Sequence, residues 1–308
     1  MEEDWILYSP SVMYSVSLLI RLLSQPHDKV LTMNPMYDAF INVIKENDRE
    51  LLSHHLIKEE GTFKIDFDVF EKQAQESTLL LLCSPHNPTG RIWSDEEMHR
   101  MIEICKKYHV KIISDEIHMD IRIKEAKHHP LMKYYGEYKD IFTASSSSKT
   151  LNTPGLIGSY VIIPDEKIRD EFLGVTRRRD FLNSASIFGM YATMIGYTEC
   201  DDYIDQLNEY IRGNMELVEN FIRDELKDFK FQRPEATYLA WIDARDVPFT
   251  SDEIQDALVN VRGVAIMKGE IYGENGAKYL RMNLGCPRSK IEEGLKRFKK
   301  AKDYLYNK

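Results

Sequence analysis

Cysteine is scarce in this chain of 308 residues, which contains four, at positions 83, 105, 200 and 286. They form no Cys-x-x-Cys pair, and their spacing fits neither a zinc knuckle nor a disulfide framework. We therefore expect reduced thiols and a cytoplasmic protein, because structural disulfides belong mainly to oxidising compartments.

Long apolar runs are also missing. The run nearest the N-terminus, Val12–Leu23, is interrupted by Ser and Arg and is preceded by Glu2, Glu3 and Asp4. A signal peptide needs a basic start, and a membrane span needs about 20 apolar residues. The sequence therefore predicts neither a signal peptide nor a membrane segment.

Basic residues are not in excess, since 41 Lys and Arg face 50 Asp and Glu and give a formal net charge of −9. A broad nucleic-acid surface needs clustered Lys and Arg. His128 and His129 are adjacent in a charged segment and are expected in solvent, and no His, Cys and carboxylate cluster has metal-ligand spacing. We therefore expect no nucleic-acid partner and no metal.

What the chain does contain is the composition of a globular protein, with 43% apolar and 30% charged residues. Its first two thirds alternate strands with helices, such as the helix that a capping box at Ser94 and Glu97 opens toward Tyr108. Strands are predicted at Lys29–Met33, Ser77–Ser84, Lys111–Asp115, Asp140–Ser146 and Ser159–Pro164. This alternation predicts an α/β fold with a mostly parallel central sheet flanked by helices.

The pattern changes after about residue 200. The elements predicted there are a long helix over Asp202–Asp228, strands at Thr237–Ile242 and Lys278–Leu284, and helices opened by capping boxes at Thr250 and Ser289. The Lys-rich stretch 290–308 is predicted as a helix with a solvated face. We expect a large domain over residues 1–200 and a smaller C-terminal α+β domain over 201–308.

Polar residues stand at the ends of three successive predicted strands, namely Asn87, Asp115 and Lys149. Ligands of open parallel sheets bind beyond the carboxyl ends of the strands. Alone, each residue has an ordinary interpretation as a turn amide, a helix cap or a surface lysine. Together and in this order, the three predict convergence on one ligand.

Four motifs extend this prediction: Pro85–Arg91, Ser114–His118, Ser147–Asn152 followed by Pro154–Leu156, and Leu280–Arg288. With them the chain resembles the fold-type I pyridoxal-phosphate enzymes of the class I/II aminotransferase superfamily, most closely the MalY/PatB branch of cystathionine β-lyases. His118 and the run from Asn283 to Arg288 carry the resemblance to this branch. The resemblance implies the PLP-transferase fold type I and pyridoxal 5′-phosphate as cofactor.

The same resemblance implies roles around the cofactor ring. Lys149 corresponds to the Schiff-base lysine, whose freed amine takes the substrate Cα proton. Asp115 corresponds to the partner of the pyridinium nitrogen. Asn87 and His118 correspond to hydrogen-bonding partners of the phenolic oxygen. Tyr37 matches the aromatic residue that stacks on the ring, although a tyrosine of the core is the alternative interpretation.

Phosphate and substrate contacts are implied as well. The backbone N–H groups of Val12 and Met13 open a predicted helix and are suited to the phosphate. Ser146 and Ser148 can add hydroxyl donors. Arg281 corresponds to the residue that binds the substrate α-carboxylate, which a guanidinium matches with two hydrogen bonds.

The function that this resemblance favours is a carbon–sulfur β-lyase. It would act on cystathionine or cysteine conjugates, which are small amino-acid substrates, and release pyruvate, ammonia and a thiol. An aminotransferase is the alternative, and only His118, the C-terminal motif and Ile157 separate the two. Ile157 stands eight residues after the lysine, where many aminotransferases of the family carry an arginine.

A third hypothesis is a truncated, catalytically impaired or regulatory family member. Members of the family have an N-terminal segment before the residues that match Asp4–Pro10, and nothing in this sequence matches that segment. Family members are dimers with active sites at the subunit interface, so a homodimer is expected here.

Overall fold

The structure is a computed structural model that describes residues 1–182 and 184–308. Its largest sheet has seven strands in the order β1-β9-β8-β7-β6-β2-β3. These strands are β1 (Ile6–Ser9), β2 (Lys29–Asn34), β3 (Glu50–His55), β6 (Leu79–Cys83), β7 (Lys111–Asp115), β8 (Ile141–Ser145) and β9 (Ser159–Ile162). Strands β3, β2, β6, β7 and β8 run parallel, whereas β9 and β1 are antiparallel to their neighbours. The prediction of a mostly parallel sheet is confirmed.

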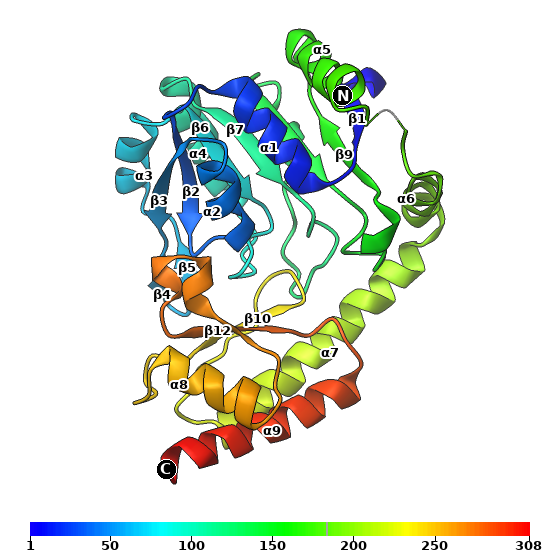
Figure 1. Cartoon of the computed structure of the whole chain (residues 1–308). Coiled ribbons are helices and arrows are strands. Elements are labelled where there is room, and N and C mark those ends of the chain that lie inside the picture. The colour runs from blue at the N-terminus through cyan, green and yellow to red at the C-terminus, as the bar shows by residue number, and fades with distance from the viewer. Residues whose placement is uncertain (183) are drawn as a thin grey trace.

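Helices cover both faces of this sheet (Figure 1). They are α1 (Val12–Leu23), α2 (Asp38–Lys45), α3 (Phe67–Ala74), α4 (Asp95–Lys107) and α5 (Glu166–Leu173). Alternate residues of β6 point to opposite faces, so Leu79 and Leu81 share a buried cluster with α1, α2 and α5, while Leu80 and Leu82 share one with α3 and α4. Coverage on both faces explains why β6 is a continuous apolar run.

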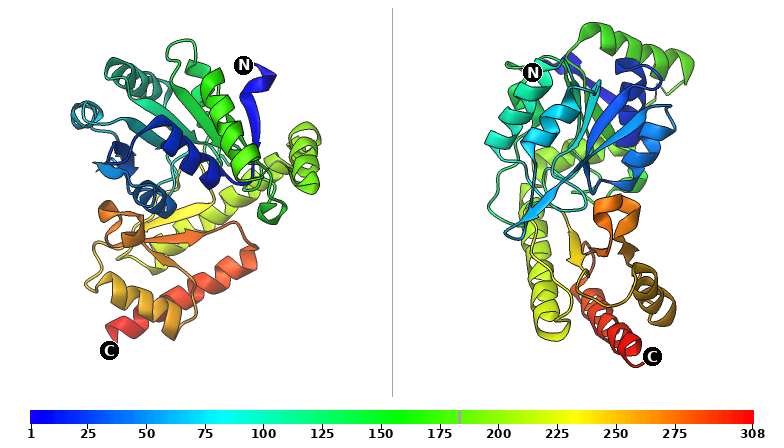
Figure 2. Two further views of the ribbon diagram at one scale, coloured as in Figure 1. Left: turned by 45° about the horizontal axis from the view of Figure 1, so that its top comes forward. Right: turned by 90° about the vertical axis from the view of Figure 1, so that its left-hand side faces the viewer.

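The C-terminal residues build a second, three-stranded antiparallel sheet in the order β10-β12-β11. Its elements are β10 (Leu239–Asp243), β11 (Met267–Lys268) and β12 (Tyr279–Asn283), with helices α7 (Asp201–Glu225), α8 (Ser251–Asp256) and α9 (Arg288–Tyr306). Apolar residues of α7, α9 and this sheet form a separate buried cluster. Figure 2 shows this part at one end of the seven-stranded sheet, with α7 running along the C-terminal part. The domain boundary near residue 200 stays a prediction.

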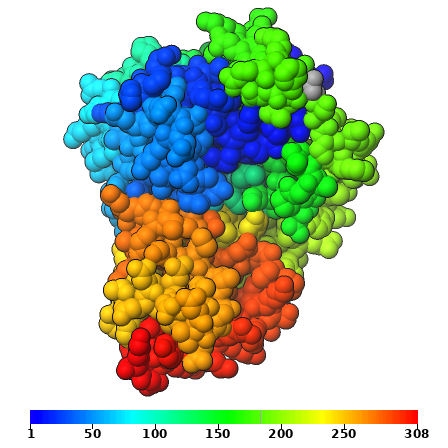
Figure 3. Space-filling view, in the orientation of Figure 1, coloured from blue at the N-terminus to red at the C-terminus, as the bar shows by residue number. Residues whose placement is uncertain are grey.

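Short elements complete the described chain. The hairpin β4 (Ile57–Glu59) and β5 (Thr62–Lys64) lies near the C-terminal sheet, and α6 (Ile187–Glu199) precedes α7. The 3₁₀ turns are Glu3–Trp5, Leu131–Tyr134, Pro154–Leu156, Gly269–Tyr272 and Glu274–Gly276, and the π-helical turns are Gly174–Arg179 and Ala257–Val261. Figure 3 shows an orange C-terminal segment packed directly under the blue N-terminal ones, with the red C-terminal end at the bottom of the molecule.

Two predictions from the sequence are wrong. Ser289 caps no helix, because α9 begins at Arg288 after Pro287, whose φ of −54° already suits helix entry. His128 does not lie in solvent, because it is buried against the carboxylate of Glu116, with His128 Nε2 and Glu116 Oε2 3.4 Å apart.

The described residues lack a membrane-spanning helix and a metal-binding cluster. None of their helices combines the length and apolarity that crossing a bilayer requires. In the same part of the chain, no group of three or more His, Cys, Asp and Glu is arranged to hold a metal ion. The four cysteines are free thiols.

Candidate active site

One pocket of ≈ 300 Å³ lies where the carboxyl ends of β6, β7 and β8 face the start of α1 and strand β12. Every site residue that the sequence predicts lines this pocket. These residues are Val12, Met13, Tyr37, Asn87, Asp115, His118, Ser146, Ser148, Lys149 and Arg281. They come from six separate segments of the chain, so the fold alone brings them together.

Asp115 is the last residue of β7 and pairs in register with Cys83 of β6 and Ala144 of β8. Its side chain is buried, and Oδ1 accepts a hydrogen bond from the Ile117 N–H at 3.1 Å. Burial raises the pKa of Asp115 to about 7, while the Ile117 N–H and the charge of Lys149 act in the opposite direction. Such a carboxyl group is ready to ionise against a cationic partner.

His118 lies in the turn after β7, and it is buried as well. Burial, together with the charges of Lys149 and Arg281, lowers the pKa of His118 to about 3, so the imidazole is neutral. Within the described part of the chain, its Nδ1 has no hydrogen-bond partner. A neutral ring with a free nitrogen beside the pocket can bond a ligand oxygen or nitrogen.

Lys149 lies in the turn after β8, where the serine run folds back on itself. Ser146 Oγ donates to the Gly158 carbonyl and accepts from the Ser148 N–H. Thr150, the residue after Lys149, is held in place because its Oγ1 donates to Asp120 Oδ2 at 2.8 Å. The neighbours of Lys149 are therefore anchored while its own side chain remains exposed in the pocket.

Helix α1 presents its N-terminus to the pocket. Ser11 caps this helix, and its Oγ accepts the Tyr14 N–H at 3.0 Å. The first N–H groups of a helix have no partner within it, so those of Val12 and Met13 remain available. Together with the helix dipole they make a site suited to an anion such as phosphate.

Arg281 reaches the pocket from β12 of the C-terminal sheet. Its Nη1 donates to Asn87 Oδ1 at 3.2 Å, and its guanidinium lies over the Tyr272 ring, 4.6 Å from the centroid. Asn87 stands in the turn after β6 and is buried. The hydrogen bond between Arg281 and Asn87 therefore joins the C-terminal sheet to the turn that follows β6 of the large sheet.

No site role was predicted from the sequence for several residues that also line the pocket, among them Tyr238, Cys83 and Asn283. The ring of Tyr238 packs edge-on against His118 with centroids 5.7 Å apart. Tyr37 is half-buried, packs edge-on against Phe40 and also lines the pocket, while its stacking on a ligand ring stays a prediction. Tyr238 and His118 are 120 positions apart in the sequence, so no local sequence pattern could have predicted their contact.

The fold and this pocket define an α/β protein with a lysine, a carboxyl group and an anion site at the strand ends. The chain belongs to the aminotransferase class I and II family, whose model matches residues 2–298. It is 36% identical over 296 residues to the protein MalY of Escherichia coli K12, covering 96% of this chain and 75% of MalY. It is 33% identical to the cystathionine β-lyase PatB of Bacillus subtilis 168, covering 96% of this chain and 77% of PatB.

Solved structures agree with this assignment. Cystalysin from Treponema denticola, which contains a pyridoxal 5′-phosphate cofactor, matches with a TM-score of 0.93 and 30% identity, covering 99% of this chain and 78% of cystalysin. The PLP-bound C-S lyase from Staphylococcus hominis matches with a TM-score of 0.90 and 29% identity, covering 98% of this chain and 77% of the lyase. The predicted family and fold are confirmed.

Proposed function

We propose that the protein is a pyridoxal 5′-phosphate-dependent carbon–sulfur β-lyase, which acts on cystathionine or cysteine S-conjugates and releases pyruvate, ammonia and a thiol. The observation that carries the proposal is the meeting of Lys149, Asp115 and Arg281 in one pocket of a chain from this family. The relatives named cystathionine β-lyase and C-S lyase support the choice of reaction.

The residues of the pocket fit the cofactor. The free N–H groups at the start of α1 and the hydroxyls of Ser146 and Ser148 would hold its phosphate. Asp115 would pair with the pyridine nitrogen, because ionisation of this buried carboxyl is favoured only beside a cation. The neutral imidazole of His118, which lines the pocket, offers a bond to the ring substituents.

Two further residues would complete the cofactor contacts. Asn87 offers its amide to the phenolic oxygen of the ring, and Tyr37 offers an aromatic face to the ring itself. When bound, the cofactor supplies an electron sink that stabilises negative charge at the substrate Cα.

The side chains of this chain then divide the work on the substrate. Arg281 holds the α-carboxylate through its guanidinium. The amine of Lys149 takes the proton from Cα as a general base. The electron pair left by that proton expels the sulfur from Cβ, and the C–S bonding electrons leave with the thiolate. The three-carbon product hydrolyses to pyruvate and ammonia.

Transamination is the second candidate, because the family includes aminotransferases and the same lysine serves both reactions. Ile157 favours the lyase. It lines the pocket in the left-handed region with a φ of 53°, and an isoleucine there supplies no cation for a phosphate. Pyruvate released from cystathionine without any added keto acid distinguishes the lyase from the aminotransferase.

Lys149→Ala tests the assignment. The wild type is expected to release pyruvate and a thiol from cystathionine and to show a visible cofactor band that borohydride removes. The variant is expected to lose about 10²–10⁴ in rate, the usual contribution of a positioned base, together with that band. Lys45→Ala, on helix α2 outside the pocket, is the control. Normal turnover by Lys149→Ala would sink the assignment.

We also propose that the protein is a homodimer. Helix α6 has no charged residue before Glu199, and its large side chains are exposed, including Phe188 at 77% and Ile187 at 68%. A helix that is apolar on every side is normally buried, and exposed apolar patches mark interaction surfaces. Exposed Ile157 continues this surface to the rim of the pocket, so a second copy seated on it would adjoin the site.

A further inference from the structure

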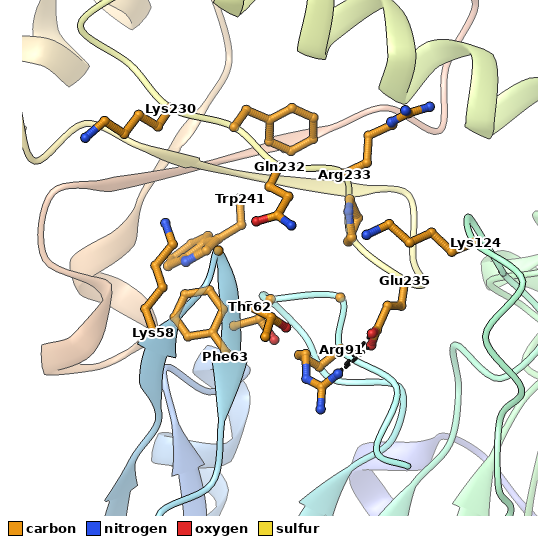
Figure 4. A pocket seen from close by; sticks show the side chains of 15 residues that line it. Lys58, Thr62, Phe63, Arg91, Lys124, Lys230, Gln232, Arg233, Glu235 and Trp241 are labelled. Carbon is orange, nitrogen blue, oxygen red and sulfur yellow. Dashed lines mark hydrogen bonds and ion pairs between the residues drawn. The ribbon is translucent and has the colours of Figure 1, made fainter.

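A second cavity lies apart from the candidate active site (Figure 4). It opens between the β4–β5 hairpin, the turn Thr89–Arg91 and the segment 230–235 that precedes β10. Its volume of ≈ 430 Å³ exceeds the ≈ 300 Å³ of the first pocket, and small-molecule sites usually measure about 300–1,000 Å³. None of the ten predicted site residues lines it.

The walls of this cavity are basic, although the chain is acidic overall. The lining cations are Lys58, Arg91, Lys124, Lys230 and Arg233, against the single carboxylate of Glu235 among the described lining residues. Four of the cations hold a carboxylate, in the pairs Lys58–Asp243, Arg91–Glu97, Lys230–Asp246 and Arg233–Glu219. Across residues 1–182 and 184–308, no carboxylate lies within 4.0 Å of the Lys124 ammonium.

Two groups around the cavity can donate hydrogen bonds to a ligand. One is the Lys124 ammonium, which carries donors only. Figure 4 shows the Gln232 amide also directed into the space above Thr62. A ligand that satisfies these groups has to bring acceptor oxygens, as a carboxylate or a phosphate ester does.

The opposite side of the cavity is aromatic. Phe63 and Trp241 line it, and Trp241 is held in place by stacking on Tyr279 with centroids 5.0 Å apart and planes 5° apart. Such a wall buries the apolar part of a ligand. We propose that this cavity is a second ligand site, which binds a small organic anion with an aromatic or aliphatic body.

The cavity is connected to the candidate active site by a short turn. The Gly90 carbonyl accepts the N–H groups of Glu235 and Ala236, and the Arg91 guanidinium pairs with Glu235. The same turn carries Asn87, which contacts Arg281. An anion beside Arg91 competes with Glu235 for that guanidinium, so occupancy of the cavity shifts the turn and changes substrate binding.

Binding is tested on the holoenzyme by isothermal titration calorimetry with phenyl phosphate as the probe. Saturable binding is expected with a Kd of about 1 mM or lower, the range of small ligands of this size. Inorganic phosphate supplies only the anionic group and benzyl alcohol only the aromatic ring, so each is expected to bind at least about tenfold more weakly. Lack of saturable phenyl phosphate binding overturns the proposal.

Variants test whether phenyl phosphate binds in this cavity. Lys124→Gln is expected to weaken binding by about two- to fivefold, as loss of an exposed ion pair does. Lys127→Gln carries the same change three residues away, outside the cavity, and is expected to leave the Kd unchanged. Arg281→Gln is also expected to leave it unchanged. Equal effects of the two lysine variants, or loss of binding in Arg281→Gln, contradict the proposal.

The connection is tested by kinetics. Phenyl phosphate at saturation is expected to change kcat/KM for cystathionine at least about twofold in the wild type and in Lys127→Gln, and less at that concentration in Lys124→Gln. A bound probe that leaves the kinetics unchanged overturns the connection. This measurement rests on the proposed lyase activity, whereas the calorimetry does not, so failure of one is distinguishable from failure of the other.

Discussion

At the scale of single residues, the candidate site holds two buried ionisable groups whose charges are suppressed. Burial raises the pKa of Asp115 to about 7 and lowers that of His118 to about 3. Both groups therefore favour the neutral form near neutral pH more than their exposed counterparts do. A bound ligand can form hydrogen bonds with both groups, and a cationic ligand can pair with ionised Asp115.

Asp115 is predicted to make stability depend on pH in the cofactor-free protein. The folded state keeps its proton up to about pH 7, whereas an unfolded Asp releases it near its ordinary value of 3.8. The contribution of this group to stability is therefore lost as pH rises through that window. Relative to wild type, Asp115→Asn is expected to gain about 3 kcal/mol between pH 5 and pH 8, measured by urea unfolding. A constant difference between the two proteins would contradict this.

Residues at strand ends could be predicted from the sequence because a polar residue after a buried apolar run has a fixed place in a parallel sheet. Asn87, Asp115 and Lys149 meet in the pocket for this reason. Tyr238 could not be predicted, since its contact with His118 depends on how the C-terminal sheet sits against the large one. His128 was misjudged because its partner Glu116 lies on a buried turn.

At the scale of secondary-structure elements, two capping boxes predicted from similar sequences have different outcomes. Ser94 Oγ accepts the Glu97 N–H at 3.1 Å, and Glu97 Oε2 accepts the Ser94 N–H at 2.8 Å. Ser289 has no such role, because Pro287 starts α9 earlier. Side-chain spacing predicts a helix start correctly only where no nearby residue fixes the backbone first.

The two serines make a matched pair of variants. Ser94→Ala is expected to lower the free energy of unfolding by about 1 kcal/mol, the usual value of a helix cap. Ser289→Ala is expected to change it by less than about 0.5 kcal/mol, as surface substitutions do. Chemical denaturation of both variants and the wild type measures the difference, and equal losses would refute the explanation.

At the scale of the whole molecule, the exposed apolar face of α6 is the surface on which we expect two subunits to associate. Phe188→Asp would place a charge in the centre of the proposed subunit interface, where an unpaired buried charge is strongly unfavourable. The variant is expected to sediment as a monomer at micromolar concentrations where the wild type is a dimer. Val69→Asp, an exposed apolar position on α3, is the control and is expected to leave the dimer intact. A wild type that sediments as a monomer would refute the interface.

Local patterns did not predict how distant parts of the chain combine. Ile6–Ser9 forms an edge strand of the large sheet only because it pairs with Ser159–Ile162, about 150 residues away. Four residues carry too little periodicity to predict such a strand. The order of the strands was likewise open, whereas their existence and mostly parallel arrangement followed from the alternation of strands and helices.

The contact between Arg281 and Asn87 has a consequence for selectivity. Arg281 Nη1 already donates to the Asn87 amide oxygen at 3.2 Å, so an incoming anion has to outcompete a neutral acceptor for that donor. A carboxylate does so by virtue of its charge and its two oxygens, whereas chloride offers no paired oxygens for the guanidinium. Competition from Asn87 therefore weakens the binding of simple anions to Arg281 more than it weakens the binding of ligands that carry a carboxylate.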